Sequence, residues 1–348
     1  MDDLSINQPV SCRRNRATLA DVARLAQVSV MAVSTVLNGA RSSTRVAATT
    51  RARITAAGAQ LGYQPNAVAR SLARQRTNII GMYTGSGSLT ADTPFGAAIL
   101  AGLQKGCAEV GRDLLLHGRF SDANRWSVTY ADLCDGRLDG ILLLTTASAP
   151  LIAQLTGSAT ALVAMVDAIP GVPSVVADDA HGAAQLVQHL AERGCRRVMW
   201  RDGGEQPAES TRRRLAGVRV TCQAHGIEVV MGDLGIAPRP FTARERALLD
   251  PRHQARTAVV CFADYVADAL VADAERLGWS VPADLMIAGF DGIELVHPPR
   301  LLRRITTLRC RWDKVGWQAV LALDQRINGK KLKDETRLPV ALVVGDTT

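Results

Sequence analysis

The sequence lacks a long apolar run. No window of its 348 residues approaches eighteen uninterrupted apolar side chains, the length expected of a membrane-spanning helix. The first residues, MDDLSINQPVSCRRNRA, contain no apolar segment of the kind that forms an export signal. We therefore expect a cytoplasmic protein with no membrane partner. At 47% apolar residues the chain can still bury a large core, and its length predicts two or three domains.

The sequence also lacks paired cysteines and metal-ligand clusters. Its seven cysteines include no C-x-x-C pair, and its six histidines form no cluster at zinc spacing. This pattern predicts reduced thiols and argues against a disulfide framework or a metal site. Neither a G-x-S-x-G nor an H-E-x-x-H motif occurs. We predict no metal, no cofactor and no catalytic residue.

Negative charge is scarce in the first 76 residues. They hold 11 Arg, 3 Asp and no Glu or Lys, whereas the remaining 272 residues hold 30 basic and 30 acidic side chains. The whole formal charge of +8 therefore belongs to the N-terminal part of the chain. Arginine donors suit phosphates and base edges, so this part is predicted to bind nucleic acid. The alternative is a solvated basic surface without a partner.

The basic stretch contains the signals of three short helices. Within residues 18–38, TLADVARLAQVSVMAVSTVLN, Thr18 is placed to cap a first helix, with Asp21 three residues later, and Ser29 is placed to cap a second. A third helix is predicted over 47–61. Three short helices of this kind form a compact unit that reads double-stranded DNA. The following AVARSLARQR can form one short amphipathic helix, which needs a partner to be stable.

From residue 78 onward, short apolar runs alternate with helical stretches. Continuous apolar strands separated by helices indicate parallel sheets covered on both faces. Two such sheets in tandem would leave a ligand cleft at the carboxyl ends of their strands. The predicted strands are 79–83, 113–118, 139–144, 161–166, 174–177, 197–200, 257–262 and 284–290, and the clearest helices are 95–110, 181–193, 211–225 and 264–277.

From Thr18 to its end the chain resembles the LacI/GalR family of bacterial transcription regulators. The matching segments include TLADVARLAQVSVMAVSTVLN, LGYQPNAVARSLARQRTNIIG, TPFGAAILAGL, VVADDAHGAAQLVQHLAERGCRRV, RRRLAG, VPADLMIAGFDG, ITTLR and LPVALVV. The resemblance implies an α/β fold, with an N-terminal three-helix helix-turn-helix DNA-binding domain and a two-lobed, periplasmic-binding-protein-like effector domain with parallel sheets. The predicted division is a disordered basic arm (1–17), the helix-turn-helix domain (18–64), a hinge helix (65–76), and an effector-binding and dimerisation domain of two lobes (77–348).

The same resemblance implies a repressor whose affinity for a pseudo-palindromic operator is controlled by a small molecule. The protein would be a homodimer or a tetramer, with the helix-turn-helix units of a dimer in successive major grooves and its hinge helices in the minor groove between them. Val30, Met31 and Thr35 match base-reading positions, while Thr18, Ser29, Ser34 and Asn38 match phosphate-contacting positions. For Thr18 and Ser29 helix capping is expected as well, and for Met31 the alternative is packing in the core.

The hinge segment carries a second set of positions. Leu72 matches the family's leucine that wedges between central base pairs, and Ala69 permits close approach of the two paired helices. Tyr63, Pro65 and Asn66 resemble a pivot between the reading helices and the hinge.

The effector site follows from the resemblance too. A sugar or sugar derivative needs convergent charged groups and an aromatic face in a cleft. Arg214, Asp291 and Asp167 match effector-contacting positions; Trp312 matches the aromatic position, and Pro94 with Phe95 the cleft-facing start of a helix. Asp264 follows Ala263 where many relatives have Asn-Asp, and the segment 297–304 is unusually basic, so an anionic or atypical effector stays open.

Two rival functions share parts of this pattern. An enzyme with a dinucleotide fold could use GSGSLT (85–90) as a phosphate loop, but the third glycine and the acidic partner are missing. A periplasmic sugar-binding protein would share the two lobes. It would carry an export signal, however, and would lack the basic helical unit. Retardation of generic DNA at low salt would separate a regulator from both rivals.

Overall fold

The computed structural model describes residues 17–38, 46–84, 93–116, 126–144, 149–203, 208–234, 238–250, 256–292 and 303–348. The chain divides into two compact units, Met1–Thr77 and Asn78–Thr348. The predicted arm at 1–17 and the loop GSGSLT lie outside the described residues, apart from Ala17.

The described residues of the first unit form four helices. Helix α1 (Leu19–Ala26) is followed by α2 (Val30–Asn38), α3 (Ala48–Gln60) and α4 (Ala67–Arg74). Thr18 and Asp21 form a capping box at the start of α1, as predicted, and Ser29 Oγ accepts a hydrogen bond from the amide of Ala32 at 3.2 Å. These caps satisfy amides that would otherwise lack partners.

The turn between α1 and α2 depends on one residue. Gln27 ends α1 in the left-handed conformation, with φ 52°, and the two helices meet at 110°. Val22 of α1, Val33 of α2 and Ile54 of α3 are fully buried against one another. The apolar faces predicted from helical spacing therefore form a single small core. Among the described residues no single helix is long and apolar enough to cross a membrane. The bent pair α1 and α2, counted together, reaches the length and apolar composition of a membrane span.

The part of the second unit that the structure describes contains two six-stranded sheets. The first sheet has the order β11-β5-β4-β3-β1-β2 and is parallel throughout; the second has the order β12-β10-β9-β8-β6-β7, with β12 antiparallel to β10. The strands are β1 (Ile79–Tyr83), β2 (Asp113–Leu116), β3 (Gly140–Leu143), β4 (Ala161–Met165), β5 (Ser174–Ala177), β6 (Arg197–Arg201), β7 (Glu228–Met231), β8 (Thr257–Cys261), β9 (Leu285–Asp291), β10 (Thr306–Cys310), β11 (Glu335–Leu338) and β12 (Val340–Val343).

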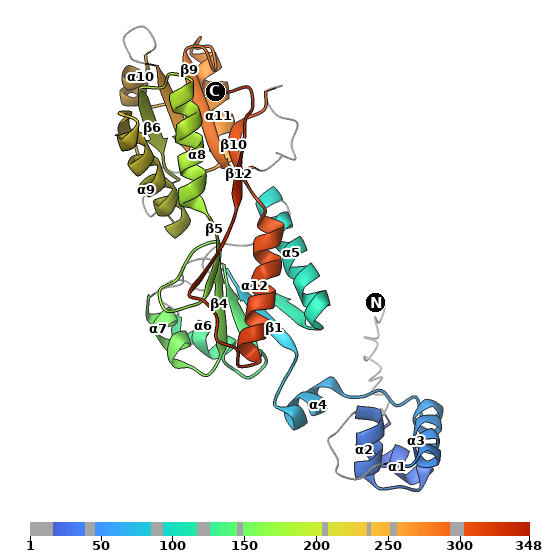
Figure 1. Cartoon of the computed structure of the whole chain (residues 1–348). Helices are drawn as coiled ribbons and strands as arrows, with labels where there is room; N and C mark the ends of the chain where they lie inside the picture. The colour runs from blue at the N-terminus through green and yellow to red at the C-terminus, as the bar shows by residue number, and fades with distance from the viewer. Residues whose placement is uncertain are drawn as a thin grey trace, which may run out of the picture. The chain divides into compact units, whose positions relative to one another are not determined.

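Helices cover both faces of each sheet (Figure 1), as the continuous apolar strands predict. In the first lobe, α5 (Pro94–Val110) and α12 (Trp312–Ile327) cover one face, and α6 (Trp126–Leu133) and α7 (Ala149–Gly157) the other. In the second lobe, α8 (Asp179–Glu192) and α9 (Glu209–Ala224) lie opposite α10 (Ala243–Leu249) and α11 (Asp264–Arg276). Strand β3 shows the alternation, because Leu142 packs under α5 and α12 and Leu143 packs under α6 and α7.

The chain passes between the two lobes three times, at Asp178, Arg311 and Pro339. Strand β5 leads into α8, β10 leads into α12, and β11 leads into β12. Three parallel connections allow the lobes to move about one hinge region while their cores stay intact. The carboxyl ends of the parallel strands in both lobes face the space between them, so the fold itself creates the predicted cleft.

Candidate functional site

The predicted recognition surface of the first unit is the exposed side of α2. The side chains of Val30 and Met31 are 47% and 63% exposed and take no part in the core. Core packing, the alternative for Met31, is therefore not what the structure shows. Thr35 donates its hydroxyl hydrogen to the carbonyl of Met31 at 2.9 Å. Two apolar side chains and a hydroxyl thus lie near the start of a helix whose other face is buried.

A set of polar contacts joins the end of α2 to α4, the predicted hinge helix. The amide of Asn38 donates to the hydroxyl of Tyr63 at 3.5 Å, and the guanidinium of Arg74 donates to the Asn38 carbonyl at 2.6 Å. Asn66 caps α4 by accepting from the amide of Ala69 at 3.3 Å. The Asn38 side-chain oxygen is buried and has no partner among the described residues. The pivot predicted at Tyr63 and Asn66 therefore lies where the two helices are tied together.

The other predicted DNA contacts fall on the same elements. Thr18 and Ser29 are exposed at the starts of α1 and α2, and Ser34 is half-buried within α2. Ala69 is exposed on α4, and the backbone of Leu72 lies in the same helix. Helix starts present free amides to an anion, so Thr18 and Ser29 can combine capping with phosphate binding.

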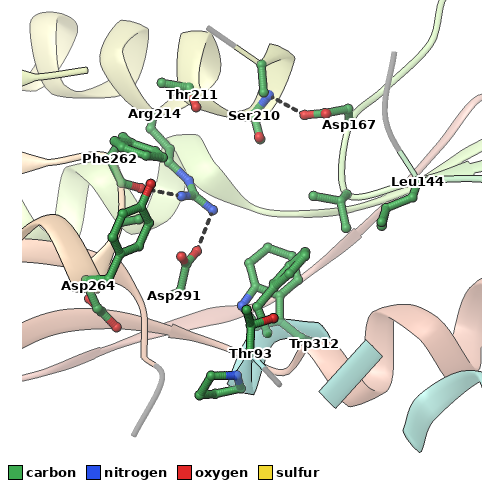
Figure 2. A pocket seen from close by; sticks show the side chains of 16 residues that line it. Thr93, Leu144, Asp167, Ser210, Thr211, Arg214, Phe262, Asp264, Asp291 and Trp312 are labelled. Carbon is green, nitrogen blue, oxygen red and sulfur yellow. Dashed lines mark hydrogen bonds and ion pairs between the residues drawn. The ribbon is translucent and has the colours of Figure 1, made fainter. Parts of the chain in front are cut away.

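In the second unit a cavity of about 450 Å³ opens between the two lobes. Its lining includes all six residues predicted to contact an effector, together with Pro94 (Figure 2). Phe95 and Trp312 come from α5 and α12 of the first lobe, whereas Arg214 and Asp264 come from α9 and α11 of the second. The remaining lining residues, which the sequence did not indicate, are Thr93, Leu144, Val166, Ala208, Ser210, Thr211, Phe262, Ala263 and Tyr265.

Arg214 is the centre of a buried ion network. Its side chain is almost fully buried, its Nε donates to Asp179 at 2.9 Å, and its Nη2 donates to Asp291 at 3.1 Å. The Nη1 atom donates to the carbonyl of Phe262 at 2.6 Å, and the guanidinium lies 4.9 Å from the centre of the Phe290 ring. A buried guanidinium requires such partners, since an unpaired one would be costly. Arg214 is thus not a surface member of the run 212–214.

The network changes the acidity of its members. Burial raises the pKa of Asp291 to about 6, although the positive charge of Arg214 acts in the opposite direction. Burial alone would lower the pKa of Arg214, but Asp291 and Asp179 outweigh it and raise that pKa. Burial, and secondarily Asp291, also raises the pKa of Tyr265. Arg214 therefore stays charged, and Asp291 is the group placed to take up a proton near neutral pH.

Backbone conformation is unusual at two points of the cavity. Val166 follows β4 with φ 72°, and Asp291 ends β9 with φ 110°. Positive φ is disfavoured for residues with a Cβ, above all for a β-branched one. Strain of this kind persists where the surrounding structure fixes it, and it is common in binding sites. Val166, after a first-lobe strand, and Asp291, at the end of a second-lobe strand, both line the same cavity.

The cavity offers little to an anionic ligand. Three carboxylates and one guanidinium line it. Of the basic segment 297–304, residues 297–302 lie outside the described part of the chain; Arg303 pairs with Glu275 and Arg304 with Asp346, and neither lines the cavity. The expectation of an anionic effector thus has no support from the residues that the structure describes.

Both units of the chain resemble known proteins. Residues 18–66 match the family described as bacterial regulatory proteins, lacI family, and residues 187–348 match the periplasmic binding protein-like domain. Over 334 residues the chain is 31% identical to the ribose operon repressor of Escherichia coli (strain K12), which covers 92% of this chain and 96% of that protein. It is 29% identical to the HTH-type transcriptional repressor PurR of Aliivibrio salmonicida, over 90% of this chain and 93% of that one.

Solved structures show the same fold. The Lac repressor dimer bound to operator and the anti-inducer ONPF superposes with a TM-score of 0.75 at 23% identity, covering 96% of this chain and 99% of that chain. The complex of the transcriptional regulator CelR with cellobiose superposes with a TM-score of 0.64 at 27% identity, over 96% and 100%.

Proposed function

We propose, because the chain belongs to the lacI family of bacterial regulatory proteins, that it is a transcriptional repressor whose binding to operator DNA is controlled by a small molecule. The observation that carries this proposal is the combination of a basic helix-turn-helix unit with a two-lobed unit that encloses a cavity. The relatives named above are repressors, and one solved relative is a dimer on its operator. We infer a homodimer that acts on chromosomal DNA in the cytoplasm.

In this proposal α2 reads DNA and α4 forms the hinge. Val30 and Met31 offer apolar surface to thymine methyl groups, and Thr35 offers a hydroxyl. Thr18, Ser29, Ser34 and Asn38 would position the unit on phosphates. The tie from Arg74 to the end of α2 would hold the hinge helix in register with the reading helix, while Leu72 and Ala69 would meet the minor groove.

In this proposal a ligand bound in the cavity between the lobes controls operator binding. Because its walls come from both lobes, a ligand that contacts Trp312 on one side and Arg214 on the other favours one relative arrangement of the lobes. A ligand can shift the equilibrium only by its difference in affinity for the two arrangements. We infer that the cavity serves binding rather than catalysis and that sugars or their derivatives are the first class to test, since one structural relative is a complex with cellobiose.

The experiment has two stages. DNA that the full-length protein selects from a random-sequence library defines the operator, which should be an inverted repeat if a homodimer reads it. Small molecules are then tested for release or tightening of that complex, with stabilisation against heat as an independent measure of binding. Failure to enrich any DNA sequence would contradict the proposal and would favour a binding protein without a DNA role.

A further inference from the structure

The charges that line the cavity do not balance. Arg214 directs one hydrogen bond from each of its three guanidinium nitrogens to protein acceptors, and its two anionic partners are Asp179 and Asp291. Asp179 also pairs with Arg213, at 2.8 Å, so within the lining Arg214 balances the charge of Asp291 alone. Asp167 and Asp264 add two further negative charges to the cavity wall.

Asp167 is the informative one of these carboxylates. Asp167 is only 4% exposed. Among the described residues its carboxylate accepts a hydrogen bond from the backbone amide of Ser210, at 2.8 Å. No cationic side chain pairs with it among those residues. A buried carboxylate normally has several donors or a cationic partner, because desolvation of the charge is costly. The cavity, which Asp167 lines, is the remaining direction from which a partner can come.

Aromatic rings stand on both sides of the same space. Phe95 and Trp312 form an edge-to-face pair in the first lobe, with centroids 5.0 Å apart, and Phe262 and Tyr265 form another in the second lobe, 5.8 Å apart. Ring faces attract cations, and they do so more strongly where water is excluded. Carboxylates together with aromatic rings favour a ligand that carries positive charge.

Trp312 adds a separate requirement. Its indole nitrogen is buried and has no hydrogen-bond acceptor among the described residues, although its ring lines the cavity. Figure 2 shows the indole across the cavity from Arg214, on the side of Asp291. A buried N–H group needs an acceptor, and a ligand hydroxyl or ether oxygen would supply one.

We infer that the effector is a hydroxylated amine such as an amino sugar, whose positive charge is held by Asp167 and whose oxygen accepts a hydrogen bond from Trp312. This inference rests on the proposed function of the cavity as the effector site. It narrows the ligand from sugars in general to those that carry an ammonium group, because a neutral sugar would leave the buried charge of Asp167 without a cationic partner.

The test uses full-length protein at pH 7 and three matched sets of probes. Each set contains an amino sugar, its neutral parent and its N-acetyl derivative: glucosamine, galactosamine and mannosamine with their counterparts. Binding is measured by calorimetry and by the shift of the unfolding temperature. We expect at least one amino sugar to bind more tightly than both of its neutral counterparts, by about tenfold or more, as the loss of one charged contact would predict.

Variants locate the charge. Asp167→Asn should weaken binding of that amino sugar by about tenfold, whereas Asp167→Glu should retain part of it. Asp113→Asn removes a carboxylate from the exposed strand β2 and should leave the affinity as in the parent. If Asp167→Asn fails to fold, the comparison of Asp167→Glu with the charge-matched probes still decides the matter.

The inference would be overturned by a neutral or N-acetylated probe that binds as tightly as its amine, or by the absence of binding by all three amines. Release of the selected operator by a neutral sugar would also overturn it while leaving the proposed repressor function intact. Failure of the protein to select any DNA would instead contradict the repressor function and leave the ligand measurements unaffected.

Discussion

Arg214 of α9 and Asp291 at the end of β9 are joined by a 3.1 Å ion pair that lies at the wall of the ligand cavity. Asp179 at the start of α8 holds the other side of the same guanidinium at 2.9 Å. Three elements of the second lobe therefore meet at one cation. A ligand that contacts this group acts on a rigid point of the lobe rather than on a mobile side chain.

Replacement of Arg214 by Met should destabilise the second unit. The change leaves Asp179 and Asp291 buried with one fewer cation, which costs about 3 kcal/mol in comparable buried pairs. Urea unfolding of the full chain measures the change in the free energy of unfolding. The matched control is Arg212→Met at an exposed position two residues earlier. Equal stability of the two variants would contradict a structural role for the ion network.

Asp291 should give the stability a defined pH dependence. Its folded pKa is raised to about 6 by burial, above the value of 3.8 expected when unfolded, despite Arg214; Asp179 adds to the rise. The folded state therefore binds the proton more tightly, so this group's contribution favours folding below pH 3.8 and is lost as the pH rises through 6. Between these values, wild type should lose stability relative to Asp291→Asn as the pH increases. Parallel pH profiles of the two proteins would contradict the assignment.

Reading and anchoring can be separated at Met31. Met31→Ala should weaken binding to selected DNA by about 1 kcal/mol and leave binding to unrelated DNA nearly unchanged, because an apolar contact with a base edge carries sequence information. Val220→Ala, at another exposed apolar position outside the DNA-binding unit, serves as the control. An equal loss on both DNAs would mean that Met31 does not read sequence.

The contact between α5 and α12 permits almost no added volume at Gly102. A Cβ built there would lie 2.0 Å from the carbonyl oxygen of Asp313, so Gly102→Ala must displace the helices that carry Phe95 and Trp312. We expect a loss of about 2 kcal/mol in stability together with weaker ligand binding. Gly157→Ala is the control, since a Cβ there meets nothing within 4 Å. Equal unfolding midpoints for the two variants would show that the helices can separate without cost.

The sequence predicted the helices and strands that carry clear periodic signals. The first three helices of the DNA-binding unit have apolar faces, α1 and α2 also have side-chain caps, and eight strands are continuous apolar runs, so all were found. The strands β7, β10, β11 and β12 were missed. They lie toward sheet edges, and β10 and β11 mix polar with apolar residues, as TTLRC and ETRL do. Helix α12 was missed as well, although its start supplies Trp312.

The same limit applies to the cavity. Arg214, Asp291 and Trp312 were identified because they match positions of known relatives, and no spacing rule would have brought them together. Asp179 gave no signal, since an acidic residue in the first turn of a helix is ordinary. Its function as a partner of Arg214 follows from packing between α8 and α9, which only the fold determines.

The central claim is that the basic N-terminal unit carries DNA binding. The most direct measurement compares the affinity of the full chain for DNA with that of residues 78–348 over a range of salt concentrations. Because the whole surplus of positive charge belongs to residues 1–76, the full chain should lose about a thousandfold in affinity between about 50 mM and about 200 mM salt. The shortened protein should bind no DNA while retaining a cooperative unfolding transition. Equal affinity of the two proteins, or an affinity of the full chain that does not change with salt, would contradict the account.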